Sequence, residues 1–214
     1  MLQDFIYDTI KLFYNKFSKY IISIYLTGSR IIPFLEPTAT DYDFFILVNS
    51  NRSKNKIIKY LDGNTINING YKIDFRLWSV SEFNKYKISG ITKWYDYQFH
   101  FMDNEEPIFG KKLVFKSRLD DNKVEYIKAM LYVTEVSYIN YIKKYGDQSE
   151  FFPLKMFYHI LLWFYILINN SYTSFTKKQI DDIKKAKDCM FTTNDVYRYL
   201  TTMINPTLHK LLAD

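Results

Sequence analysis

Two carboxylates, Asp41 and Asp43, stand one residue apart at the head of the apolar run "DYDFFILVNS", residues 41–50. The aromatic and β-branched side chains of this run predict a buried strand. Because side chains alternate along a strand, Asp41 and Asp43 share one face, where they repel each other, and Tyr42 points to the other face. A carboxylate at the mouth of a buried strand is costly unless something neutralises it. The pair therefore predicts a cation at this place.

A third carboxylate, Asp74, lies in another apolar strand candidate, "YKIDFRLWS". If that strand lies beside the first, three sets of oxygen ligands converge, and such ligands select Mg²⁺ or Mn²⁺. The pattern thus predicts a divalent-metal site formed by Asp41, Asp43 and Asp74. The alternative is structural: Asp41 caps a turn, while Asp43 and Asp74 form ion pairs with lysine or arginine side chains.

A possible phosphate site precedes the acidic pair. Gly28 ends the apolar run "IISIYLTG", and Ser29 follows it. Backbone N–H groups at this turn and the Ser29 hydroxyl can hold phosphate oxygens. Arg30 follows directly, and its fork of donors suits oxyanions, although an arginine in a surface turn is an equal alternative. The sequence therefore indicates a phosphate-binding turn at residues 28–30.

The order of predicted elements divides the chain into an α/β half and a helical half. Residues 2–20 predict an amphipathic helix, and residues 21–28 and 41–50 predict strands, with a short helix at 51–63. Asn69-Gly70 predicts a hairpin turn between two further strands, and Ser79 or Ser81 with Glu82 predicts a helix start. Helices are expected at 91–102 and, after a short extended piece at 106–113, at 120–146, 151–169, 176–188 and 193–204.

These elements predict an α+β fold: a small mixed sheet with flanking helices, followed by an all-helical C-terminal domain. The expected domains are residues 1–115 and residues 116–214. With 214 residues, 48% of them apolar, the chain is long enough to bury a substantial core. No internal repeat or long linker interrupts it.

Composition limits the setting and the partners. A single cysteine, Cys189, excludes an internal disulfide framework and favours a cytoplasmic location. The net charge of +6 favours a polyanion, although a Lys- and Asn-rich composition also follows from an AT-rich genome. Pro153, Lys155 and His159 interrupt the apolar run at 151–168, so we expect a buried helix and no membrane span.

The motifs together resemble those of the DNA polymerase β-like nucleotidyltransferase superfamily. The resemblance covers residues 21–79: Gly28-Ser29, eleven intervening residues, Asp41-x-Asp43, and a single Asp74 on a later strand. It implies a small mixed sheet and two-metal transfer of a nucleoside monophosphate from an NTP to an acceptor hydroxyl, with release of pyrophosphate. Asp41 and Asp43 would hold both ions, Mg²⁺ or Mn²⁺, and Asp74 the catalytic one.

The helical half adds a second, smaller resemblance. The stretch around Lys155 and His159 is similar to a Lys-x-x-x-His helix in helical domains of some phage and bacterial nucleotidyltransferases, including the RNA-repair-associated family. In such enzymes the helical domain forms the other wall of the nucleotide cleft. The resemblance implies that Lys155 approaches the triphosphate, together with Gly28, Ser29 and Arg30.

The sequence thus predicts a cytoplasmic nucleotidyltransferase that uses an NTP, with ATP favoured, and transfers its nucleotide to an RNA 3′ end, tRNA being the obvious candidate. AMPylation of a protein and modification of a small molecule such as an aminoglycoside are alternative acceptor reactions. A non-catalytic module that binds a nucleotide or a protein is the alternative from another functional class.

Overall fold

The structure of the chain is a computed structural model that describes residues 2–36, 39–61, 64–89, 102, 105–115, 119–139, 142, 152–171 and 173–213. At residues 86–89, 119–122, 137, 152–153 and 155–156 it describes the backbone alone. The chain forms two compact units: Met1–Gly90 with Gln98–Lys116, and Ile91–Tyr97 with Ser117–Asp214. Each unit is described by itself below.

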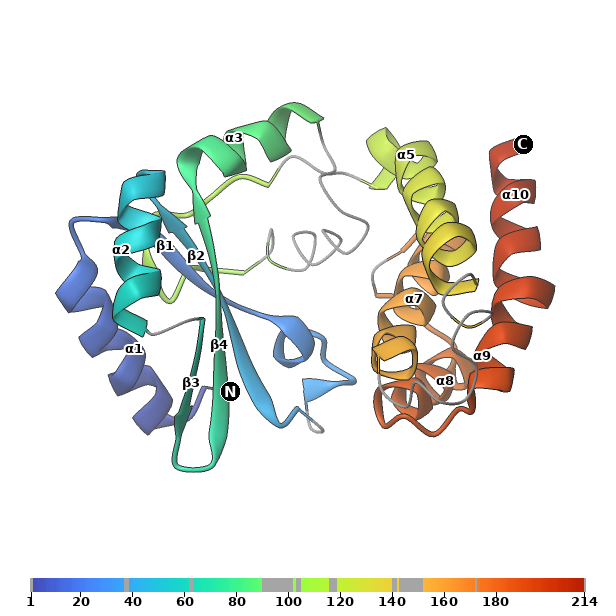
Figure 1. The fold of residues 1–214 in the computed structure, drawn as a ribbon, viewed down its shortest axis with the longest axis horizontal. Helices are drawn as coiled ribbons and strands as arrows, with labels where there is room; N and C mark the ends of the chain where they lie inside the picture. The colour runs from blue at the N-terminus through green and yellow to red at the C-terminus, as the bar shows by residue number, and fades with distance from the viewer. Residues whose placement is uncertain are drawn as a thin grey trace. The chain divides into compact units, whose positions relative to one another are not determined.

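The first unit is built on a five-stranded mixed sheet with the order β3-β4-β2-β1-β5 (Figure 1). The central strand β2 runs antiparallel to β1 and parallel to β4. The strands are β1 (Ile21–Thr27), β2 (Asp41–Val48), β3 (Thr65–Ile68), β4 (Tyr71–Ser79) and β5 (Phe109–Gly110). The expected hairpin joins β3 to β4, with Asn69 and Gly70 both at positive φ as a two-residue turn requires.

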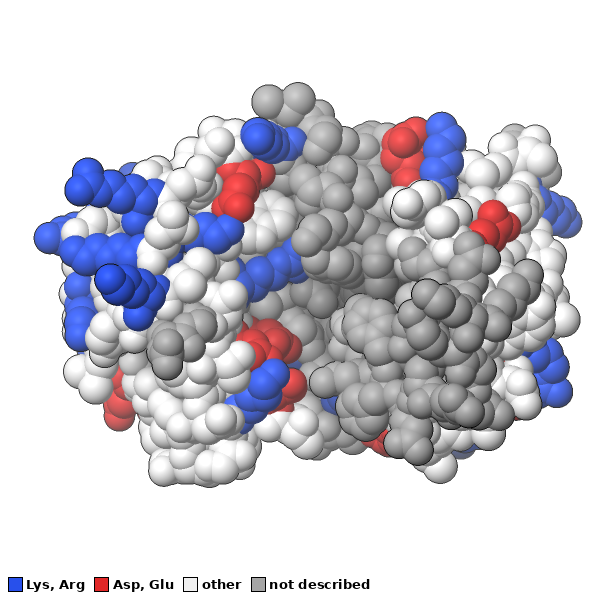
Figure 2. All heavy atoms as spheres, in the orientation of Figure 1, with Lys and Arg blue, Asp and Glu red and all other residues white. Residues whose placement is uncertain are grey.

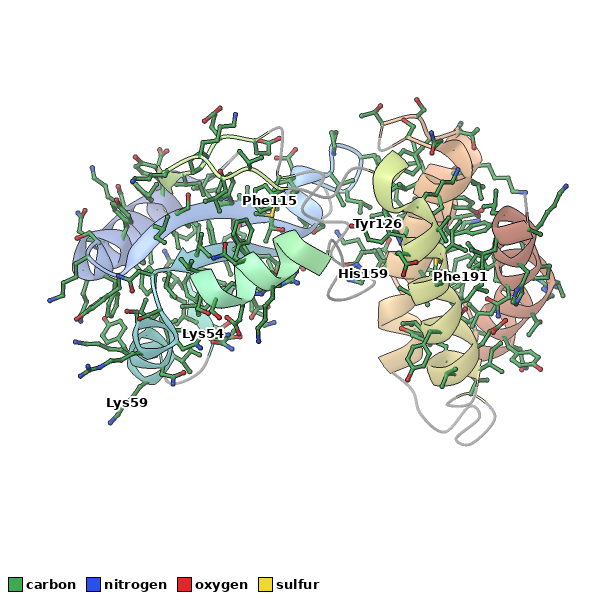
Figure 3. The ribbon with its side chains drawn as sticks, turned by 90° about the horizontal axis from the view of Figure 1, so that it is seen from above. Lys54, Lys59, Phe115, Tyr126, His159 and Phe191 are labelled. Carbon is green, nitrogen blue, oxygen red and sulfur yellow. The ribbon has the colours of Figure 1, made fainter. Side chains whose placement is uncertain are left out.

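Helices cover both faces of this sheet. On one face α1 (Asp4–Phe17) and α2 (Asn51–Leu61) pack their apolar stripes against Tyr42, Phe44 and Ile46 of β2. On the other face Phe83 of α3 (Val80–Ser89) packs with Phe45 and with residues that include Phe115, labelled in Figure 3. The alternation of β2 therefore sends its even-numbered residues to one core and its odd-numbered residues to the other.

Helix α3 begins with the serine and glutamate that the sequence singled out. The backbone N–H and hydroxyl of Ser79 both donate to Glu82 Oε2, at 2.7 and 3.2 Å, and the Glu82 backbone N–H donates back to Ser79 Oγ at 3.3 Å. This reciprocal arrangement is a capping box. Ser79, not Ser81, is thus the residue that caps α3.

The described part of the second unit is helical. Its central helix α7 (Phe152–Asn169) is buried on nearly all sides from Phe157 to Leu167, and Tyr126 of α5 meets the Trp163 ring edge-on with centroids 4.5 Å apart (Figure 3). The remaining elements are α5 (Leu119–Leu131), the π-helical segment η4 (Tyr132–Ile139), α8 (Lys177–Lys187), α9 (Thr193–Tyr199), the π-helical segment η6 (Leu200–Ile204) and α10 (Asn205–Ala213).

The structure confirms the α+β class and refines several expected elements. The helix expected at 120–146 changes to π geometry at Tyr132, and its expected end at Gly146 lies outside the described residues, as does nearly all of the helix expected at 91–102. Helix α10, which the sequence analysis did not anticipate, follows η6. No helix in the described part of the chain combines the length and hydropathy that a bilayer crossing needs.

Candidate metal centre

The three carboxylates of the sequence motif lie together at one end of the sheet. In the parallel register of β2 and β4, Asp43 lies opposite Asp74 and Asp41 lies opposite Lys72. One oxygen of each of Asp41, Asp43 and Asp74 lies within 4.8 Å of an oxygen of the other two. The predicted convergence therefore exists in the fold, because two residues of β2 and one of β4 present their side chains on the same face.

Residues on this face of β2 differ in burial, because α3 and the residues packed with it cover the later part of the strand. Phe45 and Leu47 share the face of Asp41 and Asp43 and are buried in the second core. Asp41, Asp43 and Asp74 are only partly buried. The acidic cluster (Asp41, Asp43 and Asp74) thus lies on an apolar face and stays accessible to ions.

The surroundings of Asp43 disfavour its ionised form. Burial, then the negative charges of Asp41 and Asp74, raise its pKa to about 7, against smaller opposing effects of Lys72 and Arg76. Desolvation and like charges both disfavour an ionised carboxylate. A divalent cation beside Asp43 would outweigh both effects, because it would add positive charge to the small contribution that Lys72 and Arg76 make there.

Gly28 approaches the cluster more closely than any larger residue could. Its φ is +72°, and a Cβ built on it would lie 2.9 Å from Asp43 Cγ and overlap Asp43 Oδ2. The glycine begins the 3₁₀ turn η1 (Gly28–Ile31), in which Gly28 and Ser29 are buried. The predicted phosphate turn therefore lies directly against the acidic cluster.

Thr27 provides an unpaired polar atom on the same face. It lies opposite Asp43 in the antiparallel register of β1 and β2, so the two side chains share the face. Thr27 is only 3% exposed, and its Oγ1 has no hydrogen-bond partner among the described residues. A buried hydroxyl without a partner carries a desolvation cost that a nearby polar ligand would remove.

Asp74 already has two partners within the fold. Lys72 Nζ forms an ion pair with Asp74 Oδ2, and Thr65 Oγ1 of β3 donates to Asp74 Oδ1. Lys72 precedes Asp74 by two residues, so strand alternation places both on one face. The sequence analysis did not single out Lys72 or Thr65, although the same period-2 reasoning that paired Asp41 with Asp43 would have found Lys72.

Arg30 supports the segment that leads into β2. Its Nε and one terminal nitrogen donate to the carbonyl oxygens of Asp41 and Ala39, at 2.7 and 3.0 Å. Its guanidinium lies 3.6 Å from the centroid of the Tyr42 ring. These contacts fix the start of β2 and thereby the position of Asp41; a contact of Arg30 with phosphate stays a prediction.

Lys155, the remaining predicted nucleotide-binding residue, belongs to α7 of the second unit. Its side chain lies outside the part of the chain that the structure describes. The predicted contact with the triphosphate therefore stays a prediction.

Comparison with known proteins adds no relative: no family model matches the chain, and no curated protein matches it either. The functional argument consequently depends on the geometry of the acidic cluster and its neighbours.

Proposed function

We propose that the protein is a metal-dependent nucleotidyltransferase. The observation that carries the proposal is the acidic cluster itself: Asp41, Asp43 and Asp74 come from adjacent parallel strands, with one oxygen of each within 4.8 Å of the others, beside a glycine that adjoins Asp43. The superfamily that the sequence motifs resemble has this order of residues.

The residues present fit a divalent cation. The donors are carboxylate oxygens, which favour hard cations such as Mg²⁺ and Mn²⁺. The raised pKa of Asp43 and the unpaired Thr27 hydroxyl beside it both indicate a place where added positive charge or a polar ligand would stabilise the fold. Asp41 and Asp43 would hold two ions, and Asp74 would hold one of them.

The chain's own residues would divide the work of transfer. Two bound ions would supply neutralisation of the triphosphate charge and of the leaving pyrophosphate. Asp74, or a water beside it, would accept the proton of the acceptor hydroxyl as the new bond from that oxygen to the α-phosphorus forms. The bond from the α-phosphorus to the oxygen that bridges it to the β-phosphorus breaks, so pyrophosphate leaves and a phosphodiester remains.

The turn at Gly28 and Ser29 would hold the β- and γ-phosphates of the NTP. Gly28 adjoins Asp43 and has no side chain to separate a phosphate from the acidic cluster, and Ser29 follows it in η1. Arg30 and Lys155 are the further cations proposed for the nucleotide, with ATP as the favoured donor. The acceptor that we propose is an RNA 3′ end.

The test uses NTPs labelled at the α-phosphate or at the γ-phosphate. Incubated with Mg²⁺ or Mn²⁺ and total RNA, the protein should transfer the α-label to RNA and release the γ-label in pyrophosphate. Asp43→Asn should lose this activity, whereas Asp181→Asn, a matched change at an exposed position of α8, should keep it. Transfer of the γ-label would contradict nucleotidyl transfer, and α-label in protein or a small molecule would contradict RNA as acceptor.

Two contacts of Asp74 favour the second candidate, a non-catalytic binding module. Asp74 is satisfied by Lys72 and Thr65 without any metal, as a purely structural carboxylate would be. In that case the acidic cluster would not bind Mn²⁺, and the protein would transfer no label from any NTP. Nucleotide binding without transfer, unchanged in Asp43→Asn, would establish this alternative.

A further inference from the structure

A group of exposed cations covers the opposite end of the first unit from the acidic cluster. This basic surface consists of Lys16 at the end of α1, Lys19 just after it, and Arg52, Lys56 and Lys59 on one side of α2. Figure 2 shows blue side chains gathered over these two helices, and Figure 3 shows Lys59 extending away from α2 into solvent.

Contacts with two tyrosines hold the two halves of the basic surface together. Lys56 Nζ donates to the Tyr20 hydroxyl at 3.1 Å, and Lys19 Nζ lies 5.1 Å from the centroid of the Tyr20 ring. Lys16 Nζ lies 3.7 Å from the centroid of the Tyr60 ring. The hydrogen bond from Lys56 and the nearby Lys19 lower the pKa of Tyr20, as a positive potential at this place requires.

The segments that carry the basic surface are poor in acids. The sequence has no Asp or Glu between Asp8 and Glu36, and none between Asp43 and Asp62. Among the described residues no carboxylate forms an ion pair with a member of the basic surface. Clustered like charges repel, so an anionic partner would stabilise this surface.

A pocket within the basic surface has the lining that a phosphate group needs. Tyr20, Arg52, Ser53 and Lys56 enclose a volume of about 360 Å³. The pocket thus offers two cations and the Tyr20 hydroxyl, whereas the Ser53 hydroxyl already donates to Asn49 Oδ1 at 2.7 Å. Charge-assisted hydrogen bonds from such cations to phosphate oxygens are strong. Exposed Asn51 and Asn55 on α2 add groups that can hydrogen-bond to a sugar or a base.

From this arrangement we infer that the basic surface binds the phosphodiester backbone of a nucleic-acid strand. The spacing of its cations supports an extended anion: Arg52 and Lys59 are seven residues apart, or about 10 Å along α2, over which a strand carries about three phosphates. Polar and charged side chains surround the pocket, which suits a hydrated backbone better than a lipid bilayer.

The basic surface is separate from the acidic cluster. Strand β2 runs from Asp43 in the cluster to Val48, three residues before α2 begins, so about 17 Å of strand separate the cluster from the start of α2. Resting on the proposed function, this separation would let the basic surface hold an acceptor strand about five nucleotides from its 3′ end. The binding itself requires no catalysis.

The test measures how tightly the protein binds fluorescently labelled single-stranded RNA and DNA of about 20 nucleotides. Fluorescence anisotropy reports the binding, in EDTA and without NTP, at KCl concentrations from about 50 to about 200 mM. The variant Arg52→Gln, Lys56→Gln, Lys59→Gln should bind at least tenfold more weakly, and its salt slope should fall by about two, since each single-strand phosphate contact contributes about 0.7. The matched control Lys177→Gln, Lys178→Gln, Lys185→Gln removes equal charge from exposed positions of α8 and should bind as the wild type does.

The outcomes separate this inference from the proposed function. Wild-type protein should bind RNA in EDTA, where metal-dependent transfer cannot occur, so binding can stand even where nucleotidyl transfer fails. Equal weakening in both triple variants, or no binding at the lowest salt, would overturn the inference. Preferential binding to vesicles of phosphatidylglycerol and phosphatidylcholine over both nucleic acids would overturn it in favour of a membrane surface.

Discussion

At the scale of single residues, the candidate metal centre depends on how closely small and charged groups approach Asp43. Gly28 leaves room for the carboxylate, and Lys72 supplies the cation nearest to Asp74. Thr27 adds a buried hydroxyl on the same face that has no partner among the described residues. Substitutions at these positions therefore test the site more specifically than removal of a carboxylate.

Gly28→Ala should damage both stability and the site. The new methyl group would overlap Asp43 Oδ2, and φ of +72° is unfavourable for alanine by itself, so we expect a loss of about 2 kcal/mol or more in the free energy of unfolding. Gly70→Ala is the matched control: its φ is +82°, but nothing lies within 4 Å of the added Cβ. Gly70→Ala should lose about 1 kcal/mol in the free energy of unfolding, measured by denaturant titration. It should keep Mn²⁺ binding, measured by calorimetry.

Lys72→Met should strengthen divalent-cation binding. The Lys72 ammonium pairs with Asp74, and a unit charge about 5 Å from a divalent ion opposes its binding by about 1–2 kcal/mol in water. Because the side chain can move aside, we expect an increase in Mn²⁺ affinity of about fivefold, measured by calorimetry, whereas Lys72→Arg should leave the affinity near the wild-type value. A loss of affinity in Lys72→Met would indicate that Lys72 supports the site.

At the scale of elements, strand register brings the site together. The pairing of β2 with β4 places Asp43 opposite Asp74, and the contacts of Arg30 with the carbonyl oxygens of Asp41 and Ala39 fix the segment before β2. In the second unit, a buried hydrogen bond joins η4 to α10: Thr134 Oγ1 donates to Asn205 Oδ1 at 2.7 Å. Substitutions in the second unit can therefore test its stability separately from the metal site in the first unit.

Thr134→Val should destabilise the second unit without affecting the acidic cluster. The change leaves Asn205 Oδ1 buried without its donor, which costs about 1–3 kcal/mol. Thr202→Val removes an exposed hydroxyl that donates to the Arg198 carbonyl and should cost less than about 0.5 kcal/mol. Denaturant titration would check both values, and Mn²⁺ affinity should stay unchanged in each variant.

Alternation along strands allowed much of the first unit to be predicted from sequence. The alternation of side chains along a strand placed Asp41 and Asp43 on one face, and Asn69-Gly70 predicted the hairpin. Strand order did not follow from the local patterns, because they do not specify which strand neighbours which. The sequence predicted that Asp74 joins Asp41 and Asp43 only if the two strands are neighbours, and the β2–β4 register shows that they are.

The helical half was less predictable at its turns and ends. The change to π geometry at Tyr132 has no local signal comparable to a glycine or proline. Helix α10 was not anticipated, and it continues directly from η6, because Asn205 at the junction has helical backbone angles, with φ of −63° and ψ of −44°. Pro206 therefore does not mark the end of a helix here. The side chain of Lys155 lies outside the part of the chain that the structure describes, so its contact with the triphosphate stays a prediction.

At the scale of the whole molecule, the charge distribution has two poles within the first unit. At one end of the sheet, burial and the negative charges of Asp41 and Asp74 raise the pKa of Asp43. At the other end, the basic surface brings five cations together. The net charge of +6 is thus unevenly distributed. Each pole has a distinct expected ligand, a divalent cation for the first and a phosphodiester backbone for the second.

The stability of the metal-free protein should respond to pH through Asp43. Its pKa is about 7 in the folded state against about 3.9 when unfolded, so between these values folding takes up a proton and stability falls as pH rises. Asp43→Asn removes this dependence. In EDTA the variant should gain stability over the wild type from about pH 4 to about pH 7, reaching about 4 kcal/mol, as measured by denaturant titration. A constant difference would contradict the raised pKa.

The most direct test of the central claim is a titration of the metal-free protein with Mn²⁺ near pH 7.5, followed by calorimetry and thermal unfolding. Wild-type protein should bind Mn²⁺ and unfold at a higher temperature, Asp181→Asn should behave in the same way, and both Asp43→Asn and Asp74→Asn should lose at least tenfold in affinity. Equal binding by the wild type and by Asp43→Asn, or no binding by any of the four proteins, would contradict a metal centre at Asp41, Asp43 and Asp74.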